Sequence, residues 1–205
     1  MTDSCPTRQQ MNVLSALKDI QQPDQHIVVV ERSIGAPLQA AIEAWLAYAP
    51  RLFLTRGTPE TIEREIADIM PVDAHWLLRD ILTLAHQYRT FSQTQELRVR
   101  LEIIIGDSCR RFHVDNVPLR LLCTYAGPGV QWRYQDEEAI HQTSTGAITL
   151  LKGLKFPDWS EEPAILHRSP PLSACSTPTQ RLLLTVDHPD ACGMTATTQS
   201  LLVEA

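Results

Sequence analysis

The spacing of apolar residues changes near residue 96, and this change constrains the fold more than any other feature of the 205-residue chain. Before it, apolar residues recur at helical spacing, as in residues 36–49. After it, residues 97–103 alternate between apolar and charged side chains, a pattern typical of a strand with one buried face. The sequence therefore predicts a mainly helical part at residues 1–95, a β-rich core at 96–190 and a C-terminal tail at 191–205.

Local signals refine this division. Thr58 and Pro59 are typical of a helix N-terminus, and that helix is expected to end at Pro71. A further helix is expected over residues 73–88, and one strand, residues 27–31, interrupts the helical part. The β-rich part contains many short strand candidates, at residues 112–115, 119–125, 129–134, 147–152, 165–167 and 181–187. Short strands separated by Gly and Pro turns favour a sandwich or barrel, so the predicted class is α+β.

Composition narrows the function classes. Lys and Arg total 18 against 24 Asp and Glu, and a net charge of −6 disfavours nucleic-acid binding, which needs clustered cations. No apolar run has the length of a membrane helix, and the N-terminal residues are not typical of a secretory signal. Five cysteines without a CxxC pair favour neither a disulfide framework nor a zinc ribbon. These features predict a cytoplasmic protein without nucleic-acid or membrane partners and leave its oligomeric state open.

The first candidate site residues are His113 and Asp115. On a strand they would share one face, and an imidazole beside a carboxylate makes two-thirds of the facial triad of non-haem iron sites. The plain alternative is a structural pair in which the carboxylate orients the ring. A second His-x-Asp pair, His188 and Asp190, encloses Pro189 and is predicted to be a surface turn.

The residues that follow separate the two pairs. After the first pair come His167 and then Arg181, which opens an apolar strand where an unpaired guanidinium would be costly. A bound carboxylate would neutralise that guanidinium, and the arginine fork suits two-point contact with it. Alternatively, His167 is an ordinary loop histidine, and Arg181 pairs with Asp187 or with the acidic residues at 161 and 162.

This order of residues resembles that of the Fe(II)/2-oxoglutarate-dependent oxygenases over residues 96–187. The resemblance implies a double-stranded β-helix, a jelly-roll or cupin-like barrel, against which the N-terminal helical layer would pack. It further implies that His113, Asp115 and His167 bind Fe(II) and that Arg181 binds the far carboxylate of 2-oxoglutarate. Tyr125 is assigned as a second cosubstrate contact, although Arg120 on the same strand is an alternative. Alternation allows at most one of these two to face the interior.

A second resemblance covers most of the chain. The stretches FHVDNVPLRLLCTYAGPG, LLKG, HRSPP and RLLLTVD resemble a bacterial family named for domain of unknown function 1826. That likeness implies no established activity, but it implies a link to zinc homeostasis and so makes zinc the rival metal. Cys109 lies four residues before His113, and Cys123 lies on the next strand candidate. Because thiolate and imidazole suit zinc, both are candidate zinc ligands, with buried core cysteines as the alternative.

Three hypotheses follow from these patterns. The leading one is a hydroxylase-type Fe(II)/2-oxoglutarate-dependent dioxygenase whose substrate is undefined, with no catalytic residue beyond the metal ligands. The second is a non-catalytic or cupin-like metal-binding protein that would serve the cell when zinc is limiting. The third is an interaction module without metal. The first requires the three ligands and Arg181 to share one cavity with an open coordination face. The second brings Cys109 or Cys123 to the metal or closes its fourth coordination position. The third separates His113 from His167 and exposes an apolar patch in place of a pocket.

Overall fold

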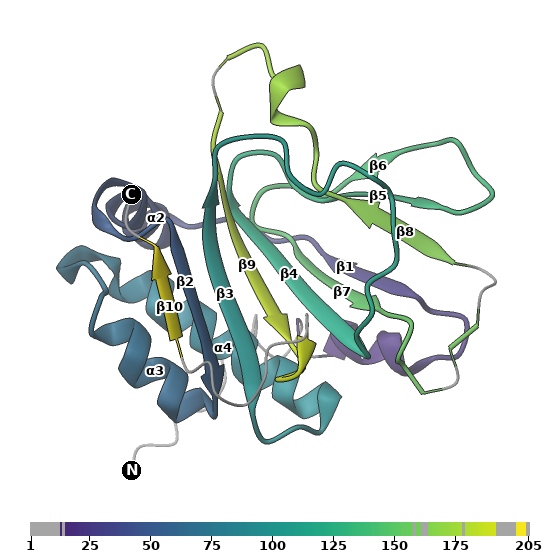
Figure 1. Cartoon of the computed structure of the whole chain (residues 1–205), viewed down its shortest axis with the longest axis horizontal. Helices are drawn as coiled ribbons and strands as arrows, with labels where there is room; N and C mark the ends of the chain where they lie inside the picture. The colour runs from purple at the N-terminus through teal and green to yellow at the C-terminus, as the bar shows by residue number, and fades with distance from the viewer. Residues whose placement is uncertain are drawn as a thin grey trace.

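Two antiparallel sheets form the framework of the protein (Figure 1). The computed structural model describes residues 13, 15–157, 159, 160, 164–177, 179–191 and 200–203, the last four by their backbone only. The large sheet has seven strands in the order β1-β7-β4-β9-β3-β2-β10, and the small sheet has three in the order β6-β5-β8. The strands of the large sheet are β1 (Ile27–Val30), β2 (Leu52–Gly57), β3 (Leu97–Ile104), β4 (Leu119–Ala126), β7 (Ile148–Lys152), β9 (Arg181–Asp187) and β10 (Ser200–Val203). Those of the small sheet are β5 (Gln131–Tyr134), β6 (His141–Gln142) and β8 (Ile165–Arg168).

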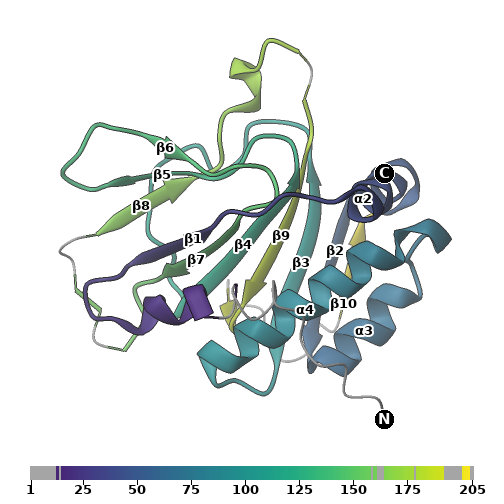
Figure 2. The same ribbon diagram turned by 180° about the vertical axis from the view of Figure 1, so that it is seen from behind.

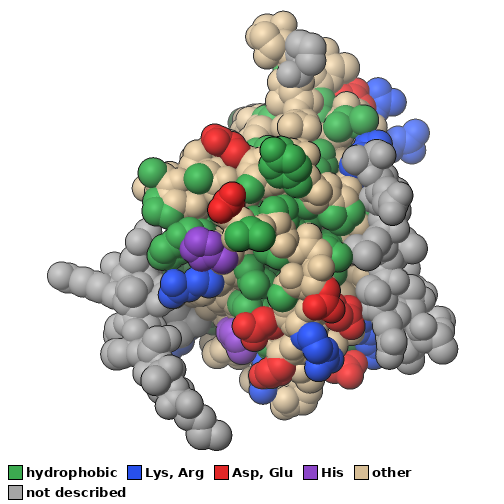
Figure 3. Space-filling model, turned by 90° about the vertical axis from the view of Figure 1, so that its left-hand side faces the viewer, with side chains coloured by type: hydrophobic (Ala, Val, Ile, Leu, Met, Phe, Trp, Pro, Cys, Tyr) green, Lys and Arg blue, Asp and Glu red, His purple; other side chains and the backbone are tan. Residues whose placement is uncertain are grey.

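Helices cover one face of the large sheet (Figure 2). They are α2 (Ala36–Tyr48), α3 (Pro59–Ala67) and α4 (His75–Ser92), with the short 3₁₀ helices η1 (Lys18–Gln21), η2 (Val72–Ala74) and η3 (Leu172–Ala174) in the connections. The main core lies between these helices and the sheet, where Trp45 and Ile81 are fully buried. On the side of the molecule that carries α2 and α3, apolar side chains gather at the surface (Figure 3). No helix in the described part of the chain combines the length and apolar character needed to cross a lipid bilayer.

Alternation along the central strands places different residues on the two faces of the large sheet. In β4, Leu121, Cys123 and Tyr125 belong to the main core, whereas Arg120 and Thr124 point to the opposite face. The small sheet lies over part of that opposite face. A second, smaller apolar cluster between the sheets consists of Ile27, Leu122, Val130, Leu151 and Ile165. The face away from the helices is therefore free to hold a site.

Most expected elements form, and the mixed class of helices and antiparallel sheet is confirmed. The Thr58 hydroxyl accepts a hydrogen bond from the Thr61 backbone at the start of α3, as its sequence predicted. That helix ends at Ala67, before Pro71. Among the described residues no strand ladder closes the two sheets into a barrel.

Three local predictions are corrected. The helical part was expected to contain one strand, residues 27–31, but residues 52–57 form a second one, β2, which pairs with β3 and has mostly buried side chains. Residues 112–115 form no strand and contribute only an isolated bridge at His113. In the tail, residues 200–203 form β10, which pairs with β2 at the edge of the large sheet.

Candidate functional site

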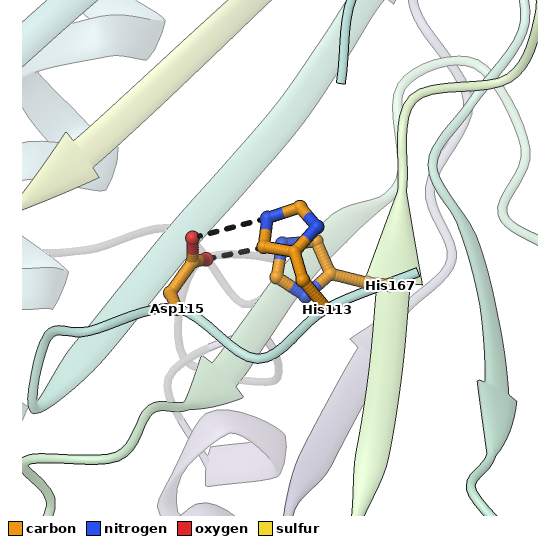
Figure 4. A group of neighbouring side chains, drawn as sticks. All are labelled: His113, Asp115 and His167. Carbon is orange, nitrogen blue, oxygen red and sulfur yellow. Dashed lines mark ion pairs between the residues drawn. The ribbon is translucent and has the colours of Figure 1, made fainter. Parts of the chain in front are cut away.

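A single backbone bridge brings together the two candidate histidines. The His113 N–H donates to the His167 carbonyl at 3.1 Å, and the His167 N–H donates to the His113 carbonyl at 3.0 Å. His167 lies on β8, and His113 lies in the connection between β3 and β4. The bridge fixes the two residues side by side, so residues 54 positions apart in the chain present neighbouring imidazole rings (Figure 4).

Asp115 faces both rings and completes a compact group. One ligand atom from each of the three residues can be chosen so that all lie within 4.8 Å of one another. His167 Nε2 lies 3.0 Å from one carboxylate oxygen of Asp115, and His113 Nε2 lies 3.5 Å from the other. The centroids of the two rings are 4.6 Å apart. The interaction-module hypothesis, which requires separated histidines, does not fit this geometry.

The backbone fixes the tautomer of His113. Its Nδ1 lies 2.9 Å from the Arg111 carbonyl oxygen, and a carbonyl can only accept a hydrogen bond. Nδ1 therefore carries a proton, and Nε2 is the ring nitrogen that faces Asp115. This is the arrangement in which a histidine is held ready for a metal, with one ring nitrogen bonded to a carbonyl and the other free to ligate.

Asp115 is buried and ionised, yet one of its oxygens has spare bonding capacity. Although burial alone would raise the pKa of Asp115, the two imidazoles and Arg120 hold that pKa well below its usual range. Arg120 donates to Oδ1. Oδ2 accepts no hydrogen bond of ordinary geometry from the described residues, although His167 Nε2 lies close to it. A buried anionic oxygen in this state is well suited to a cation.

The donor set fits a divalent metal. Two imidazole nitrogens and one carboxylate form the facial set used for non-haem Fe(II), and three protein ligands also suit a catalytic zinc ion. The cysteines do not join this group. Cys123 lies on the other face of the large sheet, where Arg32 donates to its sulfur. Cys109 lines the same cavity as the histidines but is not part of the group within 4.8 Å. A thiolate-ligated zinc site therefore finds no support in the described residues.

A cavity of about 310 Å³ connects the three residues with Arg181. The Arg181 side chain is fully buried, and its guanidinium donates to the Pro128 carbonyl at 2.7 Å, the Ser169 hydroxyl at 2.9 Å and the Thr124 hydroxyl at 3.2 Å. All three acceptors are neutral. Burial lowers the pKa of Arg181 to about 10, which the charge of Glu102 only partly opposes.

The predicted carboxylate partners of Arg181 are engaged elsewhere or fall outside the described residues. Asp187 lies at the far end of β9 and accepts from Arg98 at 2.9 Å and from Arg120 at 2.7 and 3.0 Å. The acidic residues 161 and 162 are not among those the structure describes. Arg181 forms no ion pair within the described part of the chain, so its buried charge has capacity for a bound anion.

Tyr125 does not reach this cavity, contrary to its assignment as a cosubstrate contact. It lies on the helix-covered face, where its hydroxyl donates to Asp80 Oδ2 at 2.7 Å. The physical reason is the parity of β4, which points Tyr125 toward α4 and Arg120 toward the cavity. The expectation that only one of the two faces the interior is correct, and that residue is Arg120.

Two charged neighbours of the site were not predicted from the sequence. Arg98 and Asp187 form an ion pair beneath the site, and Asp187 is completely buried. The available signal was an acidic residue closing the apolar strand 181–187, opposite a strand whose charged residues share one face. By contrast, the second His-x-Asp pair lies in an exposed turn after β9, as predicted, with 65% of the Asp190 side chain accessible.

Comparisons with known proteins agree with this geometry. A model of the family described as protein of unknown function (DUF1826) matches residues 12–187. No curated protein matches the chain. Among solved structures, the chain is similar to AtDAO1, dioxygenase for auxin oxidation 1 from Arabidopsis thaliana, in a binary complex with 2-oxoglutarate. The sequence identity is 9%, the TM-score is 0.52, and 87% of this chain and 86% of that chain are covered.

A second solved structure is that of JOX2 in complex with 2OG, Fe and JA. It is 12% identical, has a TM-score of 0.51, and covers 94% of this chain and 79% of that chain. At this level of identity the two similarities concern the fold. They show that the arrangement of helices and antiparallel sheets described above is shared with oxygenases of the 2-oxoglutarate kind.

Proposed function

This chain belongs to the DUF1826 family of proteins of unknown function, and we propose that it is an oxygenase dependent on Fe(II) and 2-oxoglutarate. One observation carries the proposal: a His-Asp-His group with a buried carboxylate, one of whose oxygens accepts no hydrogen bond of ordinary geometry, shares a cavity with a buried guanidinium that has no anionic partner among the described residues. We interpret the two sheets as an open form of the double-stranded β-helix.

The three metal-ligating residues would be His113, Asp115 and His167. His113 and His167 would ligate through Nε2, since these nitrogens face the carboxylate. Together with 2-oxoglutarate and O₂, a bound iron ion supplies the oxidative chemistry that hydroxylates a C–H bond. The part of the protein is to hold the ligands on one side of the ion and leave the other side open.

Arg181 would bind the carboxylate of 2-oxoglutarate that is farthest from the metal. Its guanidinium is oriented by the Pro128 carbonyl, Ser169 and Thr124, which accept from Nε, Nη1 and Nη2 and so account for three of its five N–H donors. An incoming carboxylate would offset the cost of burying this charge, and it would form charge-assisted hydrogen bonds. Arg181 would thereby hold the end of the cosubstrate that is farthest from the metal.

Apolar side chains would keep water away from the reacting groups. Leu122, Val130 and Leu183 line the cavity between the histidines and Arg181. A dry cavity strengthens the attraction between Arg181 and a dianion and limits side reactions. We propose a hydroxylase-type reaction for this site.

An anaerobic titration tests the proposal. Fe(II) is added to the apo-protein with and without 2-oxoglutarate, and the weak visible charge-transfer band of the iron–oxoglutarate chelate is recorded. We expect the band in the wild type and its loss in His113→Ala. In Arg181→Ala the dissociation constant for 2-oxoglutarate should rise about 10-fold or more, because a charge-assisted contact of about 1.5–3 kcal/mol is lost.

The exposed His86 on α4 provides the matched control, since His86→Ala removes an imidazole far from the site and should leave the band unchanged. Tight zinc binding without an iron–oxoglutarate band would contradict the oxygenase and favour a non-catalytic zinc-binding protein. A band that persists in His113→Ala would contradict the assignment of the ligands.

A further inference from the structure

A row of charged side chains crosses the cavity face of the large sheet beneath the metal-ligand candidates. Arg98 on β3, Asp187 on β9 and Arg120 on β4 are direct neighbours in register. Asp187 accepts from both guanidiniums and is fully buried, while the Arg98 and Arg120 side chains are 6% and 14% exposed. The position of Arg120 is therefore set from the interior of the sheet.

Arg120 uses two edges of its guanidinium for two different carboxylates. Nε and Nη2 donate to Asp187 at 2.7 and 3.0 Å, and Nη1 donates to Oδ1 of Asp115. Because the guanidinium is planar and rigid, the fork on Asp187 fixes the direction in which Nη1 points. Asp187 thus determines where Arg120 meets Asp115.

Asp115 needs this support because its own segment has little regular structure. Residues 114–116 belong to neither a helix nor a strand, and the Asp115 backbone is tied by its carbonyl, which accepts from the Leu154 N–H at 2.8 Å. A side chain on such a segment has rotational freedom unless its carboxylate is held. Among the contacts of that carboxylate, the one with Arg120 is anchored in the large sheet.

We propose that Arg120 is a positioning residue that restricts Asp115 to coordinate the metal through Oδ2 alone. This inference rests on the proposed function, because it requires that Asp115 is a metal ligand. Oδ1 is occupied by Arg120, whereas Oδ2 accepts no hydrogen bond of ordinary geometry. A carboxylate bound through one oxygen takes one coordination position. Together with His113 and His167, Asp115 would then supply three ligand atoms to a bound metal and would leave its remaining coordination positions open.

Without Arg120, both oxygens of Asp115 would be available to the metal. A carboxylate that turns to bind through two oxygens takes a further position and competes with a chelating cosubstrate. It would also lose its preset orientation, and partners that orient metal ligands typically contribute 10–100-fold to metal affinity. Arg120 therefore acts on both the affinity and the coordination number of the metal.

The test compares two arginines that share Asp187. Arg120→Gln removes contacts with Asp187 and Asp115, whereas Arg98→Gln removes a guanidinium that donates to Asp187. Affinities of the apo-proteins for Zn(II) and Fe(II) are measured by competition with chromophoric chelators. The visible spectrum of the Co(II)-substituted proteins reports the coordination number. We expect Arg120→Gln to bind both metals 10–100-fold more weakly, and Arg98→Gln to stay within about 3-fold of the wild type.

Arg120→Lys keeps a positive charge without the fork, and we expect it to recover part of the lost affinity. Thermal unfolding of the apo-protein shows whether Arg120→Gln folds. If it does not, the metal affinity and Co(II) spectrum of Arg120→Lys test the positioning role instead. Folded Arg120 variants with wild-type affinity and an unchanged Co(II) spectrum would overturn the proposal. An equal loss of metal affinity in Arg98→Gln would also overturn it, because the three charged residues would then affect metal binding only by stabilising the fold.

These outcomes are separable from those of the oxygenase test. If metal binding depends on His113 and on Arg120 but no iron–oxoglutarate band forms, the oxygenase is wrong and the positioning role stands. If the band forms normally in folded Arg120→Gln with unchanged Fe(II) affinity, the oxygenase stands and the positioning role is wrong.

Discussion

The two faces of the large sheet each carry a cluster of charged side chains that is at least partly buried, and the clusters differ in which groups lack a partner. On the helix-covered face, Arg32 donates to both oxygens of Asp80 at 2.6 and 2.7 Å and to the Gly146 carbonyl at 2.8 Å. Tyr125 donates to the same Asp80 carboxylate. The charges of this cluster balance one another, and it makes the contacts expected of a structural ion pair in a core.

On the cavity face the balance is incomplete. Asp115 retains an oxygen without a hydrogen bond of ordinary geometry, and Arg181 is buried among neutral acceptors. Both belong to one cavity. Buried polar groups in native proteins are normally satisfied, so groups with spare capacity on the lining of a cavity indicate where ligands bind. The two faces therefore differ less in their number of charged groups than in the hydrogen-bonding and ion-pairing capacity that those groups keep, and the face that keeps more is the candidate functional face.

The largest effect is expected from breaking the balanced cluster. Asp80→Asn preserves the shape of the side chain but leaves the partly buried Arg32 without its anionic partner. We expect the free energy of unfolding to fall by about 2–3 kcal/mol, between the values for exposed and for fully buried ion pairs. Urea unfolding measures this loss. Metal affinity of the folded variant should stay at the wild-type value, because Asp80 lies on α4, on the side of the large sheet away from the cavity.

Asp73→Asn is the control for this variant, since Asp73 is exposed and its substitution should cost no more than about 0.5 kcal/mol. A loss below about 1 kcal/mol in Asp80→Asn would contradict a stabilising role for the helix-side cluster. A clear fall in metal affinity would contradict the functional separation of the two faces.

A smaller effect separates two consecutive residues of β4. Thr124→Val removes the hydroxyl that accepts from Arg181, and Tyr125→Phe removes the hydroxyl that donates to Asp80. We expect Thr124→Val to raise the dissociation constant for 2-oxoglutarate about 5-fold, which corresponds to roughly 1 kcal/mol. Tyr125→Phe should lower the free energy of unfolding by about 0.5–1.5 kcal/mol and leave that constant unchanged.

For both variants, titration of the iron–oxoglutarate band gives the dissociation constant for 2-oxoglutarate, and urea unfolding gives the free energy of unfolding. The expected result is a crossed pattern, in which each substitution changes mainly one quantity. Weaker 2-oxoglutarate binding in Tyr125→Phe would restore Tyr125 as a cosubstrate contact. Unchanged binding in Thr124→Val would remove support for the anchoring of Arg181 by Thr124.

Strand parity explains which parts of the fold and the site could be predicted from sequence. The alternation in residues 97–103 and the apolar strand 181–187 are local signals, and β3 and β9 form close to where they were expected. The likeness to oxygenases supplied the candidate group His113, Asp115 and His167, which the structure brings together. Its role in metal binding stays a prediction.

Long-range pairing explains what could not be predicted. β2 is buried because β3 and β10 flank it, and its sequence gives no strong alternation. Tyr125 was assigned to the cavity because it lies on the strand that follows the ligand pair, but which parity of that strand faces the helices depends on the packing of the sheet. The contacts of Asp187 with Arg98 and Arg120 join three strands, and register between distant strands cannot be read from one sequence.

The smallest perturbation compares two cysteines on the two sides of the sheet. Cys123 is fully buried on the helix side, and burial raises the pKa of its thiol to about 11, with Arg32 opposing the shift. Cys109 is exposed in the connection that leads to His113. At pH 8 the Cys123 thiol should be protonated and sterically protected, because only the thiolate reacts with alkylating agents.

We expect iodoacetamide to label Cys109 under native conditions and Cys123 about 100-fold more slowly or not at all, as measured by peptide mass mapping. Raising the pH toward 10 increases the thiolate fraction of Cys123 but leaves it enclosed, so its labelling should instead follow the urea unfolding curve. Cys109→Ser identifies the native signal. If Cys123 were labelled as fast as Cys109 in the folded protein, its thiol would be accessible, and the helix-covered face could not be the closed, self-satisfied side of the sheet.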